Sequence, residues 1–96
     1  MNKEFIPHKQ AIEIVELGFN EQCFDYYGQI GAPLYKQAFR FFREKGFLID
    51  ITSHDKDVYE FYIRWHPNKP ILSDYYNTYE EIELECLKKL IEIAKK

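Results

Sequence analysis

The stretch from Thr78 to Lys96, TYEEIELECLKKLIEIAKK, constrains the fold more than any other part of the chain. Thr78 can accept a hydrogen bond at a helix start, and Glu81 three residues later completes a capping box. Glutamates gather at the beginning of the stretch and lysines at its end, as the helix dipole favours. The apolar residues recur at helical spacing: Tyr79, Ile82, Cys86, Leu87, Leu90, Ile93 and Ala94. The stretch is therefore predicted to form a long amphipathic helix.

Two further helices are indicated by a proline at the start and a glycine at the end. The first runs from Pro7 to Gly18. One stripe of this helix carries His8, Ala11, Ile12 and Val15, so we expect His8 to border the core.

The second helix runs from Pro33 to Gly46. A broad apolar arc holds Leu34, Tyr35, Ala38, Phe39, Phe41 and Phe42, and the opposite side carries Lys36, Arg40 and Arg43.

Two segments alternate with the period of a strand. Phe47 to Thr52 puts Phe47, Ile49 and Ile51 on one face, and Val58 to Trp65 puts Tyr59, Phe61, Ile63 and Trp65 on one face. The turn residues of Ser53–Asp57 predict an antiparallel hairpin between them.

Three less regular segments complete the prediction. His66–Pro70 is expected to be a loop and Ile71–Tyr76 a third strand. Cys23–Tyr27 favours a short strand, and Gly28 and Gly31 indicate turns.

Together these elements predict one α+β domain over residues 1–96. The order is helix, short strand or loop, helix, three-stranded antiparallel meander and C-terminal helix, with the helices packed on one face of the sheet. The other face would carry Asp50, Thr52, Glu60, Tyr62 and Arg64 beside Leu48 and Val58, and would be solvated or an interface.

The composition favours a folded cytoplasmic protein. Aromatic residues make up 18% of the chain, which indicates a filled core rather than disorder. The N-terminal residues MNKEFIPHKQ lack the apolar core of a signal peptide, and no apolar run is long enough to span a membrane. Two isolated cysteines, Cys23 and Cys86, fit a reducing compartment.

Charge argues against nucleic acid as the main partner. The net charge is −3. The best candidate for phosphate contact is the basic stripe of Lys36, Arg40 and Arg43. The element order from Pro33 onward is that of double-stranded RNA-binding domains, but those domains place lysines where this chain has TYEEIELE. Pairing of the stripe with this acidic segment, or plain solvation, explains the basic residues better.

Glu83 is an unusual acid because it falls within the apolar arc of the last helix. A partly buried carboxylate there could be a functional acid with a raised pKa. A side chain that reaches solvent past the core edge, or that pairs with Arg40 or Arg43, is the alternative that we favour, because no second catalytic group accompanies it.

The remaining candidates are a metal site and a cysteine nucleophile. His54, Asp55 and Asp57, with His66 nearby, match no zinc or calcium spacing and are ordinary turn residues. Cys86 lies on an apolar helix face, where a thiol behaves as a small hydrophobe. Cys23 with His8 or His66 lacks an orienting third group. We therefore predict no enzyme, no metal and no cofactor.

The last helix has more apolar surface than a small sheet can cover. Counting Leu84 and Ile91, its apolar arc spans about 200°, whereas a surface helix needs about 100°. Two explanations stand side by side: the helix lies between the sheet and the first helix, or it forms an interface. For the interface, with a protein partner or a second copy, the candidates are Tyr79, Leu84, Leu87, Ile91, Tyr62 and Tyr75.

Two segments, APLYKQAFRFFREKGF and TYEEIELECLKKLIEI, match the pattern PLYxQAFRxFREK followed by TYEExELxCLKKLIEI, and FIPHKQAIEIVELGF matches more loosely. On these segments the chain resembles a family of short uncharacterised proteins of gut-dwelling anaerobic bacteria and their phages or mobile elements. The resemblance implies a mobile-element setting, in which small accessory or regulatory binding proteins are common. It brings no functional residue.

These observations predict a small cytoplasmic binding or accessory module that acts through protein contacts, with a homodimer as one form. The alternative is a nucleic-acid-binding accessory protein that uses the basic face of the helix at 33–45.

Overall fold

The computed structural model describes residues 5–20, 25–27, 30–67 and 69–95. It contains three helices and two antiparallel sheets, in the order α1 (His8–Glu16), β1 (Asp25–Tyr27), β2 (Ile30–Ala32), α2 (Tyr35–Glu44), β3 (Leu48–Asp55), β4 (Val58–Arg64), β5 (Ile71–Leu72) and α3 (Tyr79–Ala94). The predicted α+β architecture is confirmed, with the three-stranded meander followed by the C-terminal helix.

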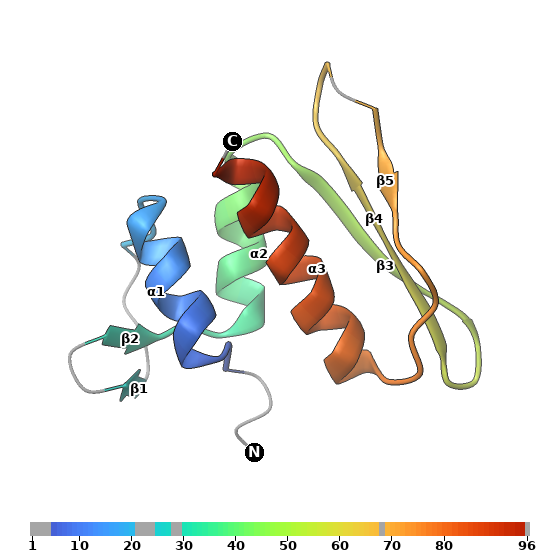
Figure 1. The fold of residues 1–96 in the computed structure, drawn as a ribbon, viewed down its shortest axis with the longest axis horizontal. Coiled ribbons are helices and arrows are strands. Elements are labelled where there is room, and N and C mark those ends of the chain that lie inside the picture. The colour runs from blue at the N-terminus through green and yellow to red at the C-terminus, as the bar shows by residue number, and fades with distance from the viewer. Residues whose placement is uncertain (1–4, 21–24, 28–29, 68, 96) are drawn as a thin grey trace.

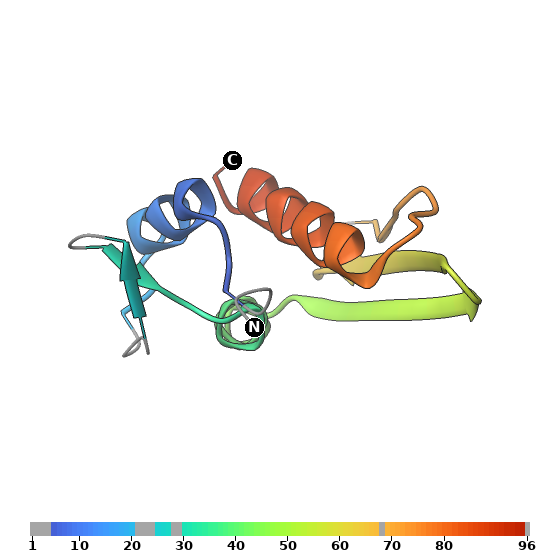
Figure 2. The same cartoon turned by 90° about the horizontal axis from the view of Figure 1, so that it is seen from below.

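Helix α3 is the centre of the molecule. It contacts β4 on one side and α1 and α2 on the other. Figure 1 shows α3 between the sheet and the two other helices, and Figure 2 shows α1 and α3 in one layer above α2 and the sheet. Because both sides of α3 are covered, its wide apolar arc is used inside the chain: Ile82, Cys86, Leu87, Leu90 and Ile91 are all buried.

The ends of the helices follow the local chemistry of the sequence. Thr78 Oγ1 accepts a hydrogen bond of 3.1 Å from the Glu81 N–H at the start of α3. At the start of α2, Gln37 Oε1 accepts from the Leu34 N–H at 2.9 Å. Gly46, just beyond α2, has φ of +102°, a left-handed conformation that favours glycine over other residues.

The three-stranded sheet has the order β3–β4–β5. Its inner face carries the alternating apolar residues predicted from the sequence, with Ile49 opposite Ile63 and Ile51 opposite Phe61. These residues pack with α2 and α3 in one core cluster, in which Phe42, Ile63 and Leu90 are fully buried.

The hairpin between β3 and β4 is tighter than predicted. The loop was predicted over Ser53–Asp57, but β3 continues to Asp55, and a bulge lies between Ser53 and Asp55. Asp57 turns the chain with a positive φ of 61°, which aspartate tolerates. The third strand is shorter than predicted, since only Ile71–Leu72 is regular, although Tyr76 still pairs with Tyr59.

Two local predictions were wrong. Gly31 was assigned to a turn, but it lies in β2 and pairs with Tyr26 of β1. In α1 the buried residues are Gln10, Ala11 and Ile14, whereas His8 is exposed and Ile12 and Val15 are 37% and 44% exposed. Apolar residues occur on more than one side of α1, and its contact with α3 decides which side is buried.

Candidate interaction surface

The outer face of the three-stranded sheet carries large apolar side chains that nothing in the described part of the chain covers. Strand register places Asp50, Tyr62 and Leu72 in one row across the three strands. Leu48 lies on the same face, opposite Arg64. Leu48 is 62% exposed and Leu72 is 65% exposed. Apolar residues with a polar surround are typical of a protein-binding surface.

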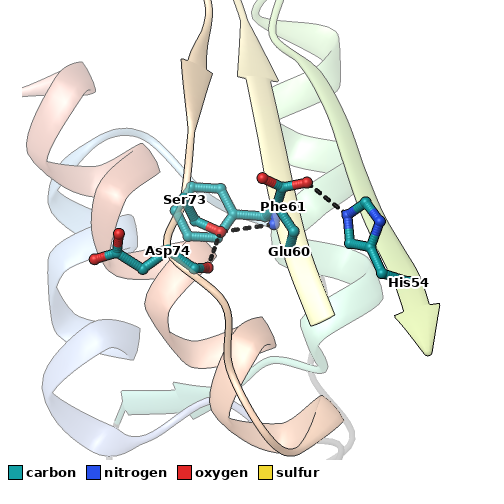
Figure 3. Close-up of polar contacts among 5 residues, drawn as sticks. All are labelled: His54, Glu60, Phe61, Ser73 and Asp74. Carbon is teal, nitrogen blue, oxygen red and sulfur yellow. Dashed lines mark hydrogen bonds and ion pairs between the residues drawn. The ribbon is translucent and has the colours of Figure 1, made fainter. Parts of the chain in front are cut away.

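A polar cluster borders this face near the hairpin. His54 Nε2 lies 2.6 Å from Glu60 Oε1, as Figure 3 shows. The ring of Tyr75 meets the His54 ring edge to face at 5.5 Å, and Tyr75 is 66% exposed. The contact places Tyr75 beside His54, at the hairpin end of the face that carries Leu48 and Leu72. We call Leu48, Tyr62, Leu72 and Tyr75 the outer patch.

Ser73 holds the short strand β5 in place. Its Oγ accepts from the Phe61 N–H at 2.9 Å and donates to the Asp74 carbonyl at 2.7 Å (Figure 3). The Ser73 N–H in turn donates to the Phe61 carbonyl at 3.0 Å. A side-chain hydroxyl thus replaces a backbone acceptor of the sheet, and this bond positions Leu72 next to Tyr62.

A side chain of α2 bonds to the free edge of β3 at one end. Arg43 Nη2 donates to the Ile49 carbonyl at 3.2 Å, so this carbonyl has a partner although none of the described strands lies beside it. The guanidinium is part of the basic stripe predicted on α2, and Lys36, Arg40 and Arg43 are indeed all exposed. Arg40 has an interaction partner as well. At least part of the stripe therefore stabilises the fold, and its contact with nucleic acid stays a prediction.

The interface residues predicted from the sequence separate into two groups. Leu87 and Ile91 are buried within the fold at 0% and 3% exposure, because α1, α2 and the sheet surround α3. They are not available to a partner. Leu84 and Tyr62 are half-buried, whereas Tyr75 is 66% and Tyr79 46% exposed. Tyr75 and Tyr79 therefore remain accessible, whereas the middle of α3 does not.

Glu83 is half-buried, as its place on the helix suggested, and it has an interaction partner within the fold. Burial raises the pKa of Tyr79, and the Glu83 carboxylate nearby raises it further, while Arg43 lowers it. The same acid and the same guanidinium act on Cys86. The carboxylate and the guanidinium thus have opposite effects on both groups.

The cysteine and histidine candidates are not brought together as a reactive site. Cys86 is a buried free thiol, and burial raises its pKa to about 12, which makes it a weak nucleophile. Cys23 lies outside the described residues. Among the described residues no group of three His, Cys, Asp or Glu side chains could hold a metal ion. His54 instead bonds Glu60, which the spacing of His54, Asp55 and Asp57 did not suggest.

Sequence reasoning placed Leu48 and Tyr62 on the outer face through strand alternation, but it missed Leu72. The signal that could have found Leu72 is the same alternation carried into β5, since Leu72 follows the inward Ile71.

Comparison of the chain with known proteins found no match. No protein-family model, no curated protein and no solved structure matches it. In the described part of the chain, no helix is both long and apolar enough to cross a membrane.

Proposed function

We propose that this protein is a small binding module whose protein partner docks on the outer patch. The observation that carries the proposal is the exposure of Leu48, Leu72 and Tyr75 on a sheet face opposite to the one that α3 covers. These three residues are more exposed than the other large hydrophobic residues at the surface of the described chain, which are Ile12, Val15 and Tyr79.

The surroundings of the outer patch fit a docking surface. Asp50, Glu60 and Arg64 alternate with the apolar residues and give a polar rim. Tyr62 and Tyr75 offer large rigid rings at low entropic cost, which is why tyrosine is enriched at interfaces. Aromatic and aliphatic side chains of the partner would fill the space between Leu48, Tyr62 and Leu72.

The wider setting of the proposal rests on the sequence. The resemblance to short phage and mobile-element proteins favours an accessory role. A cytoplasmic location agrees with Cys86, which is a free thiol rather than part of a disulfide.

The test is a comparison of binding by three forms of the chain. Leu72→Glu places a carboxylate at the centre of the outer patch, and at 65% exposure it should leave folding within about 0.5 kcal/mol of wild type. Asn20→Glu adds the same charge at an exposed position after α1, outside the strands of the three-stranded sheet, and is the matched control. Each form, carrying an affinity tag, is used to capture proteins from host-cell lysate.

A protein that binds wild type and Asn20→Glu but not Leu72→Glu would support docking on the outer patch. Equal capture of every protein by all three forms would contradict it.

A further inference from the structure

The free edge of β3 has backbone groups that face outward, and their positions follow from the pairing of the other strands. Tyr59 and Tyr76 exchange two backbone hydrogen bonds of 2.8 Å, and the Phe61 carbonyl accepts from Ser73. Odd-numbered residues of β4 therefore direct their N–H and C=O groups toward β5, and even-numbered residues direct theirs toward β3.

The same alternation applies to β3. Asp50 and Thr52 lie opposite even-numbered residues of β4 and bond to them. Ile49, Ile51 and Ser53 consequently point their backbone groups away from the sheet. The Ile49 carbonyl accepts a hydrogen bond from Arg43, which limits the open edge at one end. The bulge after Ser53 limits it at the other end. Among the described residues, Ile51 and Ser53 thus have outward N–H and C=O groups with no backbone partner, on a strand edge that invites pairing.

We infer that this edge pairs with the same edge of a second copy of the chain, antiparallel, with Ile51 of each copy opposite Ser53 of the other. The inference goes beyond the proposed function, because it concerns the backbone edge of β3 and not the outer patch. The two-fold axis passes beside Thr52. Both Ile51–Ser53 pairs then exchange their backbone hydrogen bonds, and the two sheets become continuous.

This register is selected by the ends of the open edge. Centring the axis on Ile51 would require Ile49 to bond Ser53 of the second copy, at the place where the Arg43 guanidinium lies against the Ile49 carbonyl. Centring it on Ser53 would place Ile51 opposite Asp55, which lies beyond the bulge and pairs with Val58. Only the axis beside Thr52 uses the outward groups of both residues.

The side chains of this register complement one another. The two Thr52 side chains face each other, a pair that is favourable across neighbouring strands. Asp50 of one copy lies beside His54 of the other on the outer face. Arg43, which sits at the edge next to Ile49, comes close to Asp55 of the second copy. No two like charges are placed opposite each other in this register.

In the part of the chain that the structure describes, the second half of β3 is open to this approach. From Thr52 to Asp55 every residue of β3 is exposed. Figure 2 shows the hairpin extending past α2 and α3, so the second half of β3 projects beyond the helices. Pairing there would also join the two outer patches into one larger surface.

The decisive experiment places charges on the two-fold axis. Sedimentation equilibrium of the purified protein measures the dimer dissociation constant for wild type, Thr52→Lys, Thr52→Glu and an equimolar mixture of the two variants. Each variant alone should raise the constant about ten-fold or more, because like charges meet at the axis. The mixture should recover association, because lysine then faces glutamate. Thr52→Val, which keeps the size and the β-propensity, is the uncharged control and should remain dimeric.

A second pair of variants examines the backbone groups directly. Ser53→Pro removes one outward N–H without removing a bond to β4, and Ser53→Ala keeps that N–H. Circular dichroism confirms that each variant is folded. Loss of the dimer in the first and its retention in the second is the expected result.

The inference is overturned if wild type is monomeric at every concentration, or if its dimer is indifferent to Thr52→Lys. A monomer that still shows Leu72-dependent capture would leave the proposed function standing, whereas a Thr52-dependent dimer without such capture would overturn the proposed function alone.

Discussion

Helix α3 and strand β3 use their apolar residues in opposite ways. The helix has an apolar arc of about 200°, yet α1, α2 and β4 surround it and leave Leu87 fully buried. The strand has a modest alternating pattern, yet Leu48 is 62% exposed because none of the described elements covers that face. The amount of apolar surface on an element therefore does not identify an interface; what matters is whether the fold covers that surface.

The largest effect that tests this contrast is the loss of a buried leucine. Leu87→Ala in α3 should lower the free energy of unfolding by about 2–5 kcal/mol, through lost burial and the cavity that remains. Leu48→Ala in β3 removes the same atoms from an exposed position and should change stability by about 0.5 kcal/mol or less. Urea denaturation measures both. Similar losses for the two variants would mean that Leu48 has a partner in solution, as in a dimer.

The second effect is an alkaline loss of stability caused by the Cys86 thiol inside α3. Burial raises the pKa of Cys86 from 9.0 to about 12, so the unfolded chain releases this proton at lower pH than the folded chain. The stabilisation of the folded chain by the protonated Cys86 thiol is fully present below pH 9. As the pH rises toward 12, the free energy of unfolding falls by about 1.4 kcal/mol per pH unit. Below pH 9, thiol reagents should react with Cys86 only as fast as the chain opens.

Cys86→Ala provides the control for this titration, because other groups also titrate at high pH. The difference in stability between wild type and Cys86→Ala should shrink from pH 9 to pH 11. A constant difference over this range would show that the thiol is accessible in the folded state.

The third effect is the loss of stability when a serine hydroxyl that bonds to the backbone is removed, and two serines differ in it. Ser73→Ala leaves the part-buried Phe61 N–H without its acceptor and should cost about 1–3 kcal/mol. Ser53→Ala removes a bond of 3.2 Å to the Asp55 carbonyl on the exposed part of β3 and should cost much less. Thermal unfolding separates the two variants. Equal costs would indicate that the exposed half of β3 is as well ordered by its contacts as the junction with β5.

The sequence predicted the elements whose signals are local. Thr78, Gly46 and the alternation around Ile49 and Phe61 specify helix ends and strand faces through the chemistry of a few neighbouring residues. These features were found where they were expected, and with them the α+β order of the domain.

Which residues of each element are buried depends on contacts between elements, and the sequence did not predict these contacts. The pattern of α1 admitted His8 and Val15 on the core side, but the contact with α3 buries Gln10 and Ile14 instead. Gly31 carried a turn signal, because glycine occurs in turns far more often than in strands, and the pairing with β1 overrode it. Likewise Leu87 and Ile91 looked like interface residues only as long as the positions of α1 and α2 were unknown.

The smallest effect concerns the local signal that begins α3. Thr78→Ala removes the acceptor for the Glu81 N–H and should lower the free energy of unfolding by about 1 kcal/mol. Thr78→Ser keeps the oxygen and should be close to wild type, which separates the cap from the loss of a methyl group. Because the cap lies at an exposed end, its loss should fray the first turn around Tyr79 without disturbing Leu87. Hydrogen exchange would show this as faster exchange of the Glu81 and Ile82 amides and unchanged protection from Cys86 onward. If protection fell along the whole helix, the packing around α3 would depend on its cap, and the contrast between the covered helix and the open strand would be weaker than the burial of Leu87 indicates.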